Sequence, residues 1–404
     1  MTRMETLNSL LKNLFPYKGY KLSVLERGNR ILLGLQSRRK TGDCPLCGKR
    51  CRCVETEFER TVRDLDLAGT PCFLRVKQKK IHCRCGYRGL EELNFLAKFR
   101  RVTKRMETYV VSLAEKMTLK DVAGITGLNW KTVKEIDREY IRSLLPTIEA
   151  VNIRRIAIDE IAIMKGHKYF TIIRDYDSGI VITIEFGRAY KEVAEALSRL
   201  GKEKLALIER ASLDMWDPYI KAVKEQCPNA ELIFDKFHVV KKVNEALDAI
   251  RKKEFAKATK DERISMKYKR FIILSRESNL NSAEKEELGI LMQSNEKLYK
   301  GYLLKEQVLS IFNDKISTFE QIKKRFEIWF SNILSNEMEE FYGVVNTIRQ
   351  YYYGILNYFR YGMTNAIAEG FNTKINVIKR RAYGHSDLEY FMLKIFQSSM
   401  RRLS

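Results

Sequence analysis

The sequence predicts a multidomain α/β protein that combines a small β domain, a helical module and a mixed β-sheet interrupted by an all-helical insertion. Residues 42–90 form short strand-like runs separated by turns. Residues 103–145 have a helical periodicity that ends at Pro146. Residues 155–240 alternate apolar strands with helices, and residues 241–360 have the pattern of charged amphipathic helices with few Gly and Pro.

The strands within residues 155–240 predict a sheet with both antiparallel and parallel pairs. Two apolar runs join through Asp177, Ser178 and Gly179, a combination typical of a hairpin turn. The strands that follow alternate with helices, which is the pattern of parallel strands joined by helical crossovers. We therefore expect three antiparallel strands followed by parallel ones.

A well-marked helix, NAIAEGFNTKINVIKRRAYG, lies near the end of the chain. We expect Asn365 as its N-cap and Gly384 as its end. Its apolar stripe consists of Ile367, Phe371, Ile375 and Ile378. A second face carries Glu369, Asn372, Asn376 and Lys379. The carboxylate of Glu369 is therefore expected to point with amides and a basic residue, away from the core.

The composition indicates a folded protein with a polyanionic partner. The 404 residues are 45% hydrophobic, which is enough for two or three cores. There are 74 Lys and Arg against 51 Asp and Glu, so the formal net charge is +23. The excess is largest at the start of the chain, since residues 1–100 hold 22 basic and 10 acidic side chains. A nucleic acid is therefore the first partner to expect.

No stretch of the sequence approaches the roughly 18 apolar residues that a membrane-spanning helix needs. The first residues, MTRMETLNSLLKNLF, lack the hydrophobic region and cleavage site of a secretory signal. We expect a soluble, cytoplasmic protein that has no membrane partner.

Two close cysteine pairs predict a structural zinc site. The pairs are Cys44 with Cys47 and Cys83 with Cys85, and a glycine follows each pair, which allows a tight turn that aims both sulfurs at one ion. Four thiolates without an open position are typical of structural zinc. Other candidate ligands in the same region are Cys51, Cys53, Cys72 and His82. The alternative is a set of reduced cysteines in a small sheet, and Cys227 stands apart as a plain buried thiol.

The segment TLKDVAGITGLNWKTVKEID has the spacing of a helix-turn-helix. Thr118 and Asp121 resemble a capping box, and Gly127 lies where a turn separates two short helices. The exposed start of the second helix would consist of Asn129, Trp130, Lys131 and Lys134. These side chains would reach the major groove of duplex DNA. The alternative is an ordinary three-helix packing unit.

Acidic side chains occur where buried strands are expected. Asp159 and Glu160 lie in the middle of IAIDEIAI, which is apolar on both faces. Because isolated buried carboxylates are costly, they are expected to bind a cation or to pair with a base. A second acidic strand end offers Asp214 or Asp217, and Asp235 lies one strand further on. We favour Asp214, because it ends a strand and precedes a helix.

Asp159, Asp214 and Glu369 are candidates for a catalytic site that holds two divalent cations. Three carboxylates that converge from two strands and a late helix can activate water and stabilise a leaving 3′ oxygen at phosphorus. Hard oxygen ligands favour Mg²⁺ or Mn²⁺. Asp235 and His238 would orient this site or form a satisfied core pair. Taken singly, each acid has the alternative of a solvated or salt-bridged surface group.

These residues, in this order, resemble the ISL-three family of bacterial insertion-sequence transposases over essentially the whole chain. The most specific segments are LDMWDPYIKAVKEQCPNAELIFDKFHVV and TNAIAEGFNTKINVIKRRAYG. The resemblance implies a ribonuclease H-like DDE catalytic core with a helical insertion before its final glutamate. Carried onto this chain, the triad falls on Asp159, Asp214 and Glu369, and Asp235 and His238 match an accessory motif.

The resemblance also implies a domain order and a set of partners. The expected division is an N-terminal segment 1–40, a zinc domain 41–98, a helix-turn-helix 99–147, a core 148–240 and 361–404, and an insertion 241–360. The zinc and helix-turn-helix modules would recognise inverted repeats in double-stranded DNA, and Lys379, Arg380 and Arg381 would follow the backbone. We expect a homodimer or larger assembly on DNA, because two ends must be joined.

Two other functions fit part of the same pattern. A transposase-derived repressor would bind DNA without catalysis, and a structure-selective nuclease of the same fold would cut without preferring element ends. RNA binding is compatible with the charge, but the helix-turn-helix favours duplex DNA.

Overall fold

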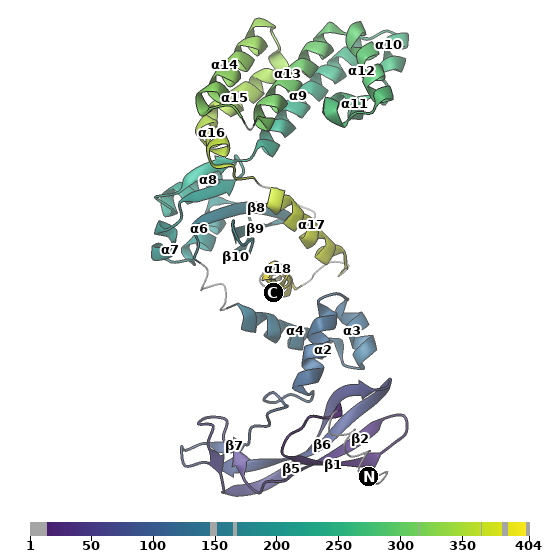
Figure 1. The fold of residues 1–404 in the computed structure, drawn as a ribbon, viewed down its shortest axis with the longest axis vertical. Coiled ribbons are helices and arrows are strands. Elements are labelled where there is room, and N and C mark those ends of the chain that lie inside the picture. Colours follow the sequence, from purple (N-terminus) through teal and green to yellow (C-terminus); the bar gives the residue numbers. More distant parts are fainter. Residues whose placement is uncertain are drawn as a thin grey trace. The chain divides into compact units, whose positions relative to one another are not determined.

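The chain folds into two compact units, shown in the computed structural model of Figure 1. The structure describes residues 14–145, 152–164, 168–314, 316–364, 366–381 and 387–400, without the side chains of residues 265 and 366–369. The first unit comprises Met1–Leu144 and Lys379–Leu393. The second comprises Leu145–Ile378 and Lys394–Ser404.

The first unit begins with a twisted β domain whose main sheet has the order β1-β2-β6-β5, with β7 paired to β6. The pair β2–β6 is parallel and the others are antiparallel. The strands are β1 (Tyr20–Glu26), β2 (Ile31–Ser37), β5 (Val54–Leu67), β6 (Thr70–His82) and β7 (Arg88–Leu90), with a separate pair β3 (Gly42–Asp43) and β4 (Arg50–Cys51). Because β1 and β2 belong to this sheet, residues 20–37 are part of the β domain and not of a separate N-terminal segment.

Three helices of the first unit form the predicted helix-turn-helix: α2 (Lys104–Ala114), α3 (Leu119–Thr126) and α4 (Trp130–Leu144). Thr118 caps α3 by accepting a hydrogen bond from the Asp121 amide. Gly127 ends α3 with a φ of 67°, a left-handed conformation that glycine adopts without strain. Val122 and Val133 are fully buried between the helices. The local signals in the sequence therefore predicted this module correctly.

Two adjacent charged residues of β5 join the β domain to these helices. The buried Asp64 carboxylate accepts hydrogen bonds from Tyr17, from Thr103 and from Arg105 of α2. Arg63, also buried, donates to the Thr126 carbonyl at the end of α3. Burial alone would raise the pKa of Asp64, but these hydrogen bonds outweigh it and hold the pKa below its ordinary value. The β domain and the helix-turn-helix are thus linked through satisfied buried charges.

The second unit is built on a mixed sheet, as the sequence predicted, and the strand order is β10-β9-β8-β11-β12. Strands β8 to β10 pair antiparallel, whereas β11 pairs parallel with β8 and with β12. The strands are β8 (Arg155–Met164), β9 (Lys168–Asp175), β10 (Val181–Phe186), β11 (Arg210–Leu213) and β12 (Glu231–Phe234). Strand β11 is shorter than the sequence suggested, because residues 202–206 form helix α7.

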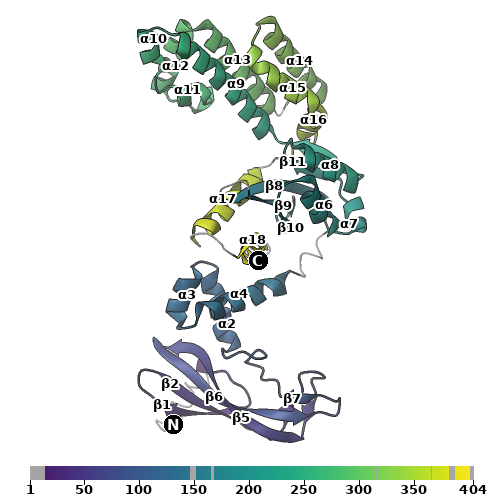
Figure 2. The ribbon, with the colours of Figure 1, turned by 180° about the vertical axis from the view of Figure 1, so that it is seen from behind.

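Helices cover both faces of this sheet. Helices α6 (Tyr190–Ser198) and α8 (Asp217–Gln226) pack together on one face, where Ile156 and Ile158 share a core with Val193 and Val223. Helix α17 (Ala366–Arg381) lies on the other face, where Phe371 contacts the Arg174 guanidinium of β9 at 4.9 Å (Figures 1 and 2).

Helix α17 has the apolar stripe that the sequence predicted, as far as its side chains are described. Phe371, Ile375 and Ile378 are buried. The side chain of Ile367, the cap Asn365 and the end Gly384 lie outside the described residues. Helix α18 (Leu388–Met400) follows, and in the second unit Ser399 accepts a hydrogen bond from the Val181 amide.

The insertion that interrupts the second unit is wholly helical in its described residues. Its helices are α9 (Lys236–Lys257), α10 (Lys260–Met266), α11 (Arg270–Leu274), α12 (Ser282–Ser294), α13 (Glu296–Asn313), α14 (Phe319–Ser335), α15 (Tyr342–Gln350) and α16 (Tyr352–Tyr361), with short 3₁₀ turns η1 (Glu277–Asn279) and η2 (Glu339–Phe341). Helix α16 returns to β12, where a Cβ on Gly354 would lie 2.4 Å from the Phe234 ring. Among the described residues, no helix combines the length and apolar character needed to cross a membrane.

A buried carboxylate holds η2 against two helices of the insertion. The Glu340 side chain is only 3% exposed, and it pairs with Lys253 at 2.9 Å and with Lys297 at 3.1 Å. Burial opposes its ionisation, but the hydrogen bonds from the two lysines lower the pKa of Glu340 to about 2. The charged form of Glu340 therefore stabilises the folded state at neutral pH.

Replacing this carboxylate is expected to destabilise the insertion in a pH-dependent way. Glu340→Gln should lower the free energy of unfolding at pH 7 by up to about 3 kcal/mol. Because the folded-state pKa is depressed, this difference should persist above the ordinary pKa of a glutamate and shrink as the pH falls toward 2. Urea unfolding followed by fluorescence of the buried Trp329 measures it. Glu339→Gln, at the exposed neighbouring position, is the control, and an equal effect of both changes would contradict the assignment.

Candidate functional site

Two carboxylates lie side by side at one edge of the mixed sheet. In the parallel pair β11–β8, Ser212 is opposite Ala157, so two further residues along both strands bring Asp214 beside Asp159. Both side chains are partly buried. Burial raises the pKa of Asp159, and the negative charge of Asp214 raises it further. This edge of the sheet therefore concentrates negative charge in a place with little water to screen it.

Asp235 lies at the same edge but has a different contact. It follows β12, whose Phe234 is opposite Leu213 of β11, so Asp235 continues the row formed by Asp159 and Asp214. Its carboxylate accepts a hydrogen bond from the Phe237 amide and thereby caps helix α9. The side chain is buried.

His238 pairs with Asp214, which follows strand β11. The acid nearest before His238 in the sequence is Asp235, which follows the neighbouring strand β12. The His238 Nε2 atom lies 2.7 Å from Asp214 Oδ1. This hydrogen bond raises the pKa of His238, which favours the protonated ring. The satisfied core pair of Asp235 with His238, one of the two sequence interpretations, is not the arrangement that the structure has.

Glu160, the neighbour of Asp159, points to the opposite face and is already neutralised. Arg188 donates two hydrogen bonds to its carboxylate, at 3.0 and 3.2 Å. The guanidinium of Arg188 also lies over the rings of Tyr169 and Trp216, at 4.3 and 5.2 Å. Asp217, another acid that the sequence offered, accepts a hydrogen bond from the Tyr351 hydroxyl at 2.8 Å. Neither Glu160 nor Asp217 therefore competes with Asp214 for the position beside Asp159.

Helix α17 is attached to Asp159 through an amide. The Asn372 Nδ2 atom donates a hydrogen bond to Asp159 Oδ2 at 2.6 Å. Glu369 lies three residues earlier in the same helix. The side chain of Glu369 itself lies outside the described residues. The sequence placed Asn372 on the face of Glu369, but its contact with Asp159 depends on tertiary structure and was missed.

The donor set at this edge fits a divalent cation. Asp159 and Asp214 supply hard oxygen ligands and two like charges, while their described hydrogen-bond and ion-pair partners include two amides, from the Glu160 backbone and the Asn372 side chain, and the His238 imidazole. Two adjacent, partly buried carboxylates repel each other unless a positive charge lies between them. Mg²⁺ or Mn²⁺ would satisfy this requirement, with Glu369 as the third candidate ligand.

The four cysteines that the sequence selected come together in the first unit. Cys44 and Cys47 lie in the turn after β3, and Cys83 and Cys85 lie in the turn after β6. Their sulfur atoms all lie within 4.8 Å of one another, with Cys44 3.7 Å from Cys85 and Cys47 3.6 Å from Cys83. Tetrahedral zinc with bonds of about 2.3 Å requires sulfur separations of about 3.8 Å. The geometry therefore fits structural zinc.

Glycines with positive φ close both turns. Gly48 has a φ of 66° and Gly86 a φ of 91°, which side chains rarely adopt. The Gly48 amide donates to the Cys44 carbonyl, and the Gly86 amide donates to the Cys83 carbonyl. These turns aim the paired sulfurs in one direction, as the sequence predicted.

The other candidate zinc ligands lie outside the four-cysteine group. Cys72 is fully buried in the core of the β domain, and Cys53 and His82 are exposed. Cys51 packs beside Cys44 and Cys83, with its thiol 3.6 Å from the Lys49 carbonyl. Cys227 is buried in the core of the second unit. Among the described side chains, Cys44, Cys47, Cys83 and Cys85 are the one group of three or more ligands that could share an ion.

The start of helix α4 presents three of the four side chains that the sequence assigned to DNA. Asn129, Trp130 and Lys131 are exposed, and the Lys131 ammonium lies 5.9 Å from the centre of the Trp130 ring. Lys134 is partly buried and forms an ion pair with Asp387 at 2.6 Å. Arg138 contacts the same carboxylate. Lys134 must therefore leave Asp387 before it can contact a phosphate.

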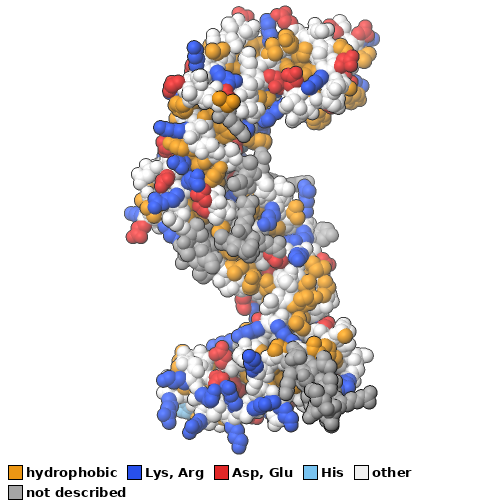
Figure 3. All heavy atoms as spheres, in the orientation of Figure 1, with side chains coloured by type: hydrophobic (Ala, Val, Ile, Leu, Met, Phe, Trp, Pro, Cys, Tyr) orange, Lys and Arg blue, Asp and Glu red, His pale blue; other side chains and the backbone are white. Residues whose placement is uncertain are grey.

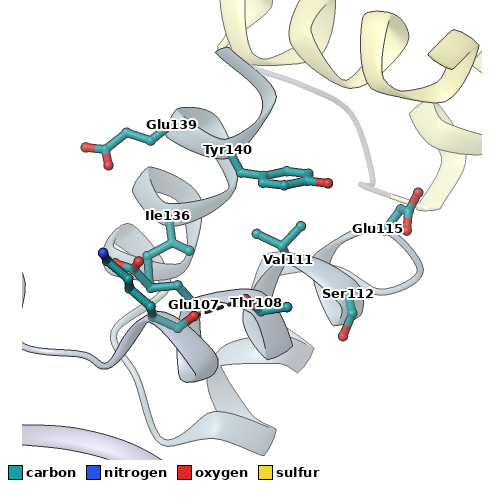
Figure 4. Close-up of a pocket in the computed structure, with 9 residues that line it drawn as sticks. Glu107, Thr108, Val111, Ser112, Glu115, Ile136, Glu139 and Tyr140 are labelled. Carbon is teal, nitrogen blue, oxygen red and sulfur yellow. Dashed lines mark hydrogen bonds between the residues drawn. The ribbon is translucent and has the colours of Figure 1, made fainter. Parts of the chain in front are cut away.

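A groove of about 480 Å³ lies between α2 and α4 (Figure 4). Val111 and Ile136 form its floor, and three carboxylates, from Glu107, Glu115 and Glu139, line it. Lys104 also lines the groove, and Arg100 pairs with Glu107 and Glu139, so the charges there are partly balanced.

Basic side chains cover much of the surface of the β domain, as Figure 3 shows. Around the cysteine turns, the exposed cations are Arg38, Arg39, Lys40, Lys49, Arg50, Arg52, Arg84 and Arg88. Lys379, Arg380 and Arg381 occupy the last turn of α17, where Arg380 is exposed and the other two are partly buried. Both groups can attract phosphates, which agrees with the charge of the chain.

Comparisons with known proteins match all three parts of the chain. Residues 156–395, more than half of the sequence, match a DDE domain of the ISL3 group described as a transposase. Residues 91–141 match the helix-turn-helix domain of transposase family ISL3. Residues 40–85 match the zinc-finger of transposase IS204/IS1001/IS1096/IS1165.

Two relatives are similar over most of their length. The transposase for insertion sequence element IS1001 of Bordetella parapertussis is 29% identical over 96% of this chain and 97% of that protein. The transposase for insertion sequence element IS1557 of Mycobacterium tuberculosis is 25% identical over 84% of this chain and 82% of that protein. The similarity to these two transposases therefore extends over most of the chain and is not confined to one of its domains.

The zinc geometry leads to a direct measurement. Purified protein is expected to contain about one zinc per chain, and Cys47→Ser should release it because three thiolates leave the tetrahedral site incomplete. Cys53→Ser is the matched control, since Cys53 is exposed and lies outside the four-cysteine group. Metal analysis of the three proteins provides the test. A zinc content well below one per chain, or equal loss in both variants, would rule out this ligand set.

Proposed function

The chain belongs to the transposase family ISL3, and from this premise we propose that it binds the ends of an insertion sequence and catalyses metal-dependent cleavage and transfer of the DNA strands. The observation that carries the catalytic part is the pairing of Asp159 with Asp214 at the edge of the mixed sheet, with α17 held to Asp159 by Asn372. A repressor would have no need for two adjacent, partly buried carboxylates at this edge.

We assign Asp159, Asp214 and Glu369 as the ligands of Mg²⁺ or Mn²⁺. When bound, such ions activate water for attack on a phosphodiester and stabilise the leaving 3′ oxygen. Asp159 has Asp214 on the neighbouring strand, and α17, the helix that includes Glu369, is tied to Asp159 by the Asn372 hydrogen bond. Strand transfer then uses the released 3′ hydroxyl as the nucleophile at the same carboxylates, and no covalent enzyme intermediate is needed.

Other residues of the site position these ligands. His238 orients the Asp214 carboxylate through its hydrogen bond and compensates part of the charge. Asp235 fixes the start of α9, the helix that presents His238. Arg188 neutralises Glu160 and contacts the Trp216 ring, two residues after Asp214. Each of these contacts restricts the motion of the strand ends that carry the acids.

We propose that the first unit recognises double-stranded DNA at the terminal inverted repeats. Asn129, Trp130 and Lys131 are assigned to the bases, and Lys134 joins them once it leaves Asp387. The basic β domain and Lys379, Arg380 and Arg381 are assigned to the backbone. Joining two DNA ends requires at least two copies of the chain, so we propose a homodimer or larger assembly on DNA.

We propose the domain division 41–98 for the zinc domain, 99–147 for the helix-turn-helix, 148–240 with 361–404 for the catalytic core and 241–360 for the insertion. Strands β1 and β2 extend the zinc domain toward the N-terminus, because they pair within its sheet. The core is interrupted between β12 and α17.

Asp159→Asn tests catalysis separately from binding. The change should abolish Mg²⁺-dependent nicking of an inverted-repeat duplex, because the amide removes the charge that would bind the ions. The same variant should shift this duplex in a gel as wild type does. Asp217→Asn, whose carboxylate contacts Tyr351, is the control that should retain nicking. Wild-type protein that binds the repeat but never nicks it would favour a DNA-binding repressor.

Asn372→Ala tests whether the amide positions the site. Loss of the hydrogen bond to Asp159 should slow nicking by about 10- to 100-fold while binding of the inverted repeat is unchanged. Asn376→Ala removes a similar amide one turn further along α17 and should have little effect. If both substitutions slow nicking equally, Asn372 has no special role.

A separate assay distinguishes a transposase from a structure-selective nuclease. A transposase should join the cut ends of the element to target DNA, whereas the nuclease would cut without preferring element ends.

A further inference from the structure

Three large apolar side chains are almost fully exposed in the helical insertion where α10 ends and α11 begins. Ile264 is 72%, Tyr268 86% and Phe271 77% exposed. The neighbouring Met266 and Ile273 are buried and hold this segment against the rest of the insertion. Single exposed apolar side chains are common, but three within eight residues indicate an interaction surface. We call Ile264, Tyr268 and Phe271 the apolar tip.

The backbone of the tip is strained at the side chain that is most exposed. Tyr268 has a φ of 65°, in the left-handed region that bulky residues rarely adopt. Packing does not offset this strain, because the Tyr268 ring is exposed. Its described contact is with the Lys267 ammonium, which lies 5.1 Å from the ring centre. A glycine would fit this backbone at lower cost. An aromatic ring held here therefore points to a use outside the folded insertion.

The same arrangement occurs in the DNA-binding unit. Phe99 has a φ of 62° and is 80% exposed, and the preceding Lys98 lies 5.2 Å from its ring centre. Phe99 lies inside the part of the chain that matches the helix-turn-helix domain of the family. A strained, exposed aromatic ring beside a lysine thus accompanies the module assigned to DNA.

The positive charge around the tip indicates which kind of partner it could bind. Between residues 257 and 271 there are six cations and two acids; Lys257, Lys269 and Arg270 pair with Glu254, Glu287 and Asp248, whereas Lys260, Arg263 and Lys267 have no described ion pair. The cations are Lys257, Lys260, Arg263, Lys267, Lys269 and Arg270. A symmetric contact between two copies would bring these like charges together, which disfavours the tip as a self-association surface. A polyanion is complementary to it.

We propose that the apolar tip is a second DNA contact, separate from the helix-turn-helix. Lys260 and Lys267 contact phosphates, and Tyr268 and Phe271 pack against the sugars and exposed base edges beside them. The contact is independent of sequence, since phosphate contacts carry no base information. This inference rests on the proposed function, because it supplies a site for DNA beyond the inverted repeat.

Tyr268→Gly separates a DNA contact from a structural role. In the Asp159→Asn background, where the DNA stays uncut, the glycine should weaken binding of a long duplex containing the inverted repeat by at least about fivefold. The melting temperature should stay equal or rise, because glycine relieves the positive φ. A fall in melting temperature with unchanged DNA affinity would overturn the proposal. Ile328→Ala, at a position 52% exposed on α14, is the control for loss of an exposed apolar side chain.

The salt dependence of binding tests the lysines. Lys260→Gln with Lys267→Gln should reduce the slope of log affinity against log salt concentration by about 1.8, the value for two phosphate contacts. The control is Lys285→Gln with Lys324→Gln, which removes two exposed lysines elsewhere in the insertion. Equal reductions in both pairs would show a general charge effect and overturn the assignment of the tip.

The possible outcomes separate this inference from the proposed function. If wild type does not bind the inverted repeat, the proposed function fails and the tip proposal fails with it. If wild type binds and nicks but Tyr268→Gly binds the long duplex equally well, only the tip proposal is overturned. If Tyr268→Gly changes the sedimentation of the DNA-free protein and not its DNA affinity, the tip is a protein interface.

Discussion

Repulsion between Asp159 and Asp214 is the constraint on which the second unit depends. A parallel pair of strands places both carboxylates at one edge, and burial makes their mutual repulsion stronger than it would be in water. His238 forms an ion pair with Asp214, and Asn372 donates a hydrogen bond to Asp159. These partners come from helices α9 and α17. This edge of the sheet thus draws together segments that are far apart in the chain.

The first unit also contains buried charges, but there a positive and a negative side chain are each satisfied by a partner. Arg63 and Asp64 are neighbours in β5, and each reaches a different helix of the helix-turn-helix. Arg63 pairs with Asp66 and Asp64 pairs with Arg105, so removing Arg63 or Asp64 would leave a partly buried charge without its partner, which costs more than losing a surface ion pair. The β domain is therefore expected to move together with helices α2 and α3.

The sequence predicted the features that depend on local signals and missed those that depend on tertiary contacts. Thr118 and Gly127 mark the helix-turn-helix because a cap and a left-handed turn need those residue types. The alternation of strands and helices likewise predicted the mixed sheet. The partner of His238 could not be predicted, because it depends on which strands are neighbours. The contact of Lys134 with Asp387 joins residues from opposite ends of the sequence and leaves no local pattern.

The insertion enters and leaves the core at a single strand. Helix α9 begins directly after β12, and in α16 the Asn357 amide donates to the Leu232 carbonyl of that same strand. Because its two ends are anchored to one short strand, the whole helical segment behaves as a cassette. Evolution can lengthen, shorten or exchange such a cassette without altering the register of the sheet. A change in the length of the insertion would therefore leave Asp159 and Asp214 at the same positions in the sheet.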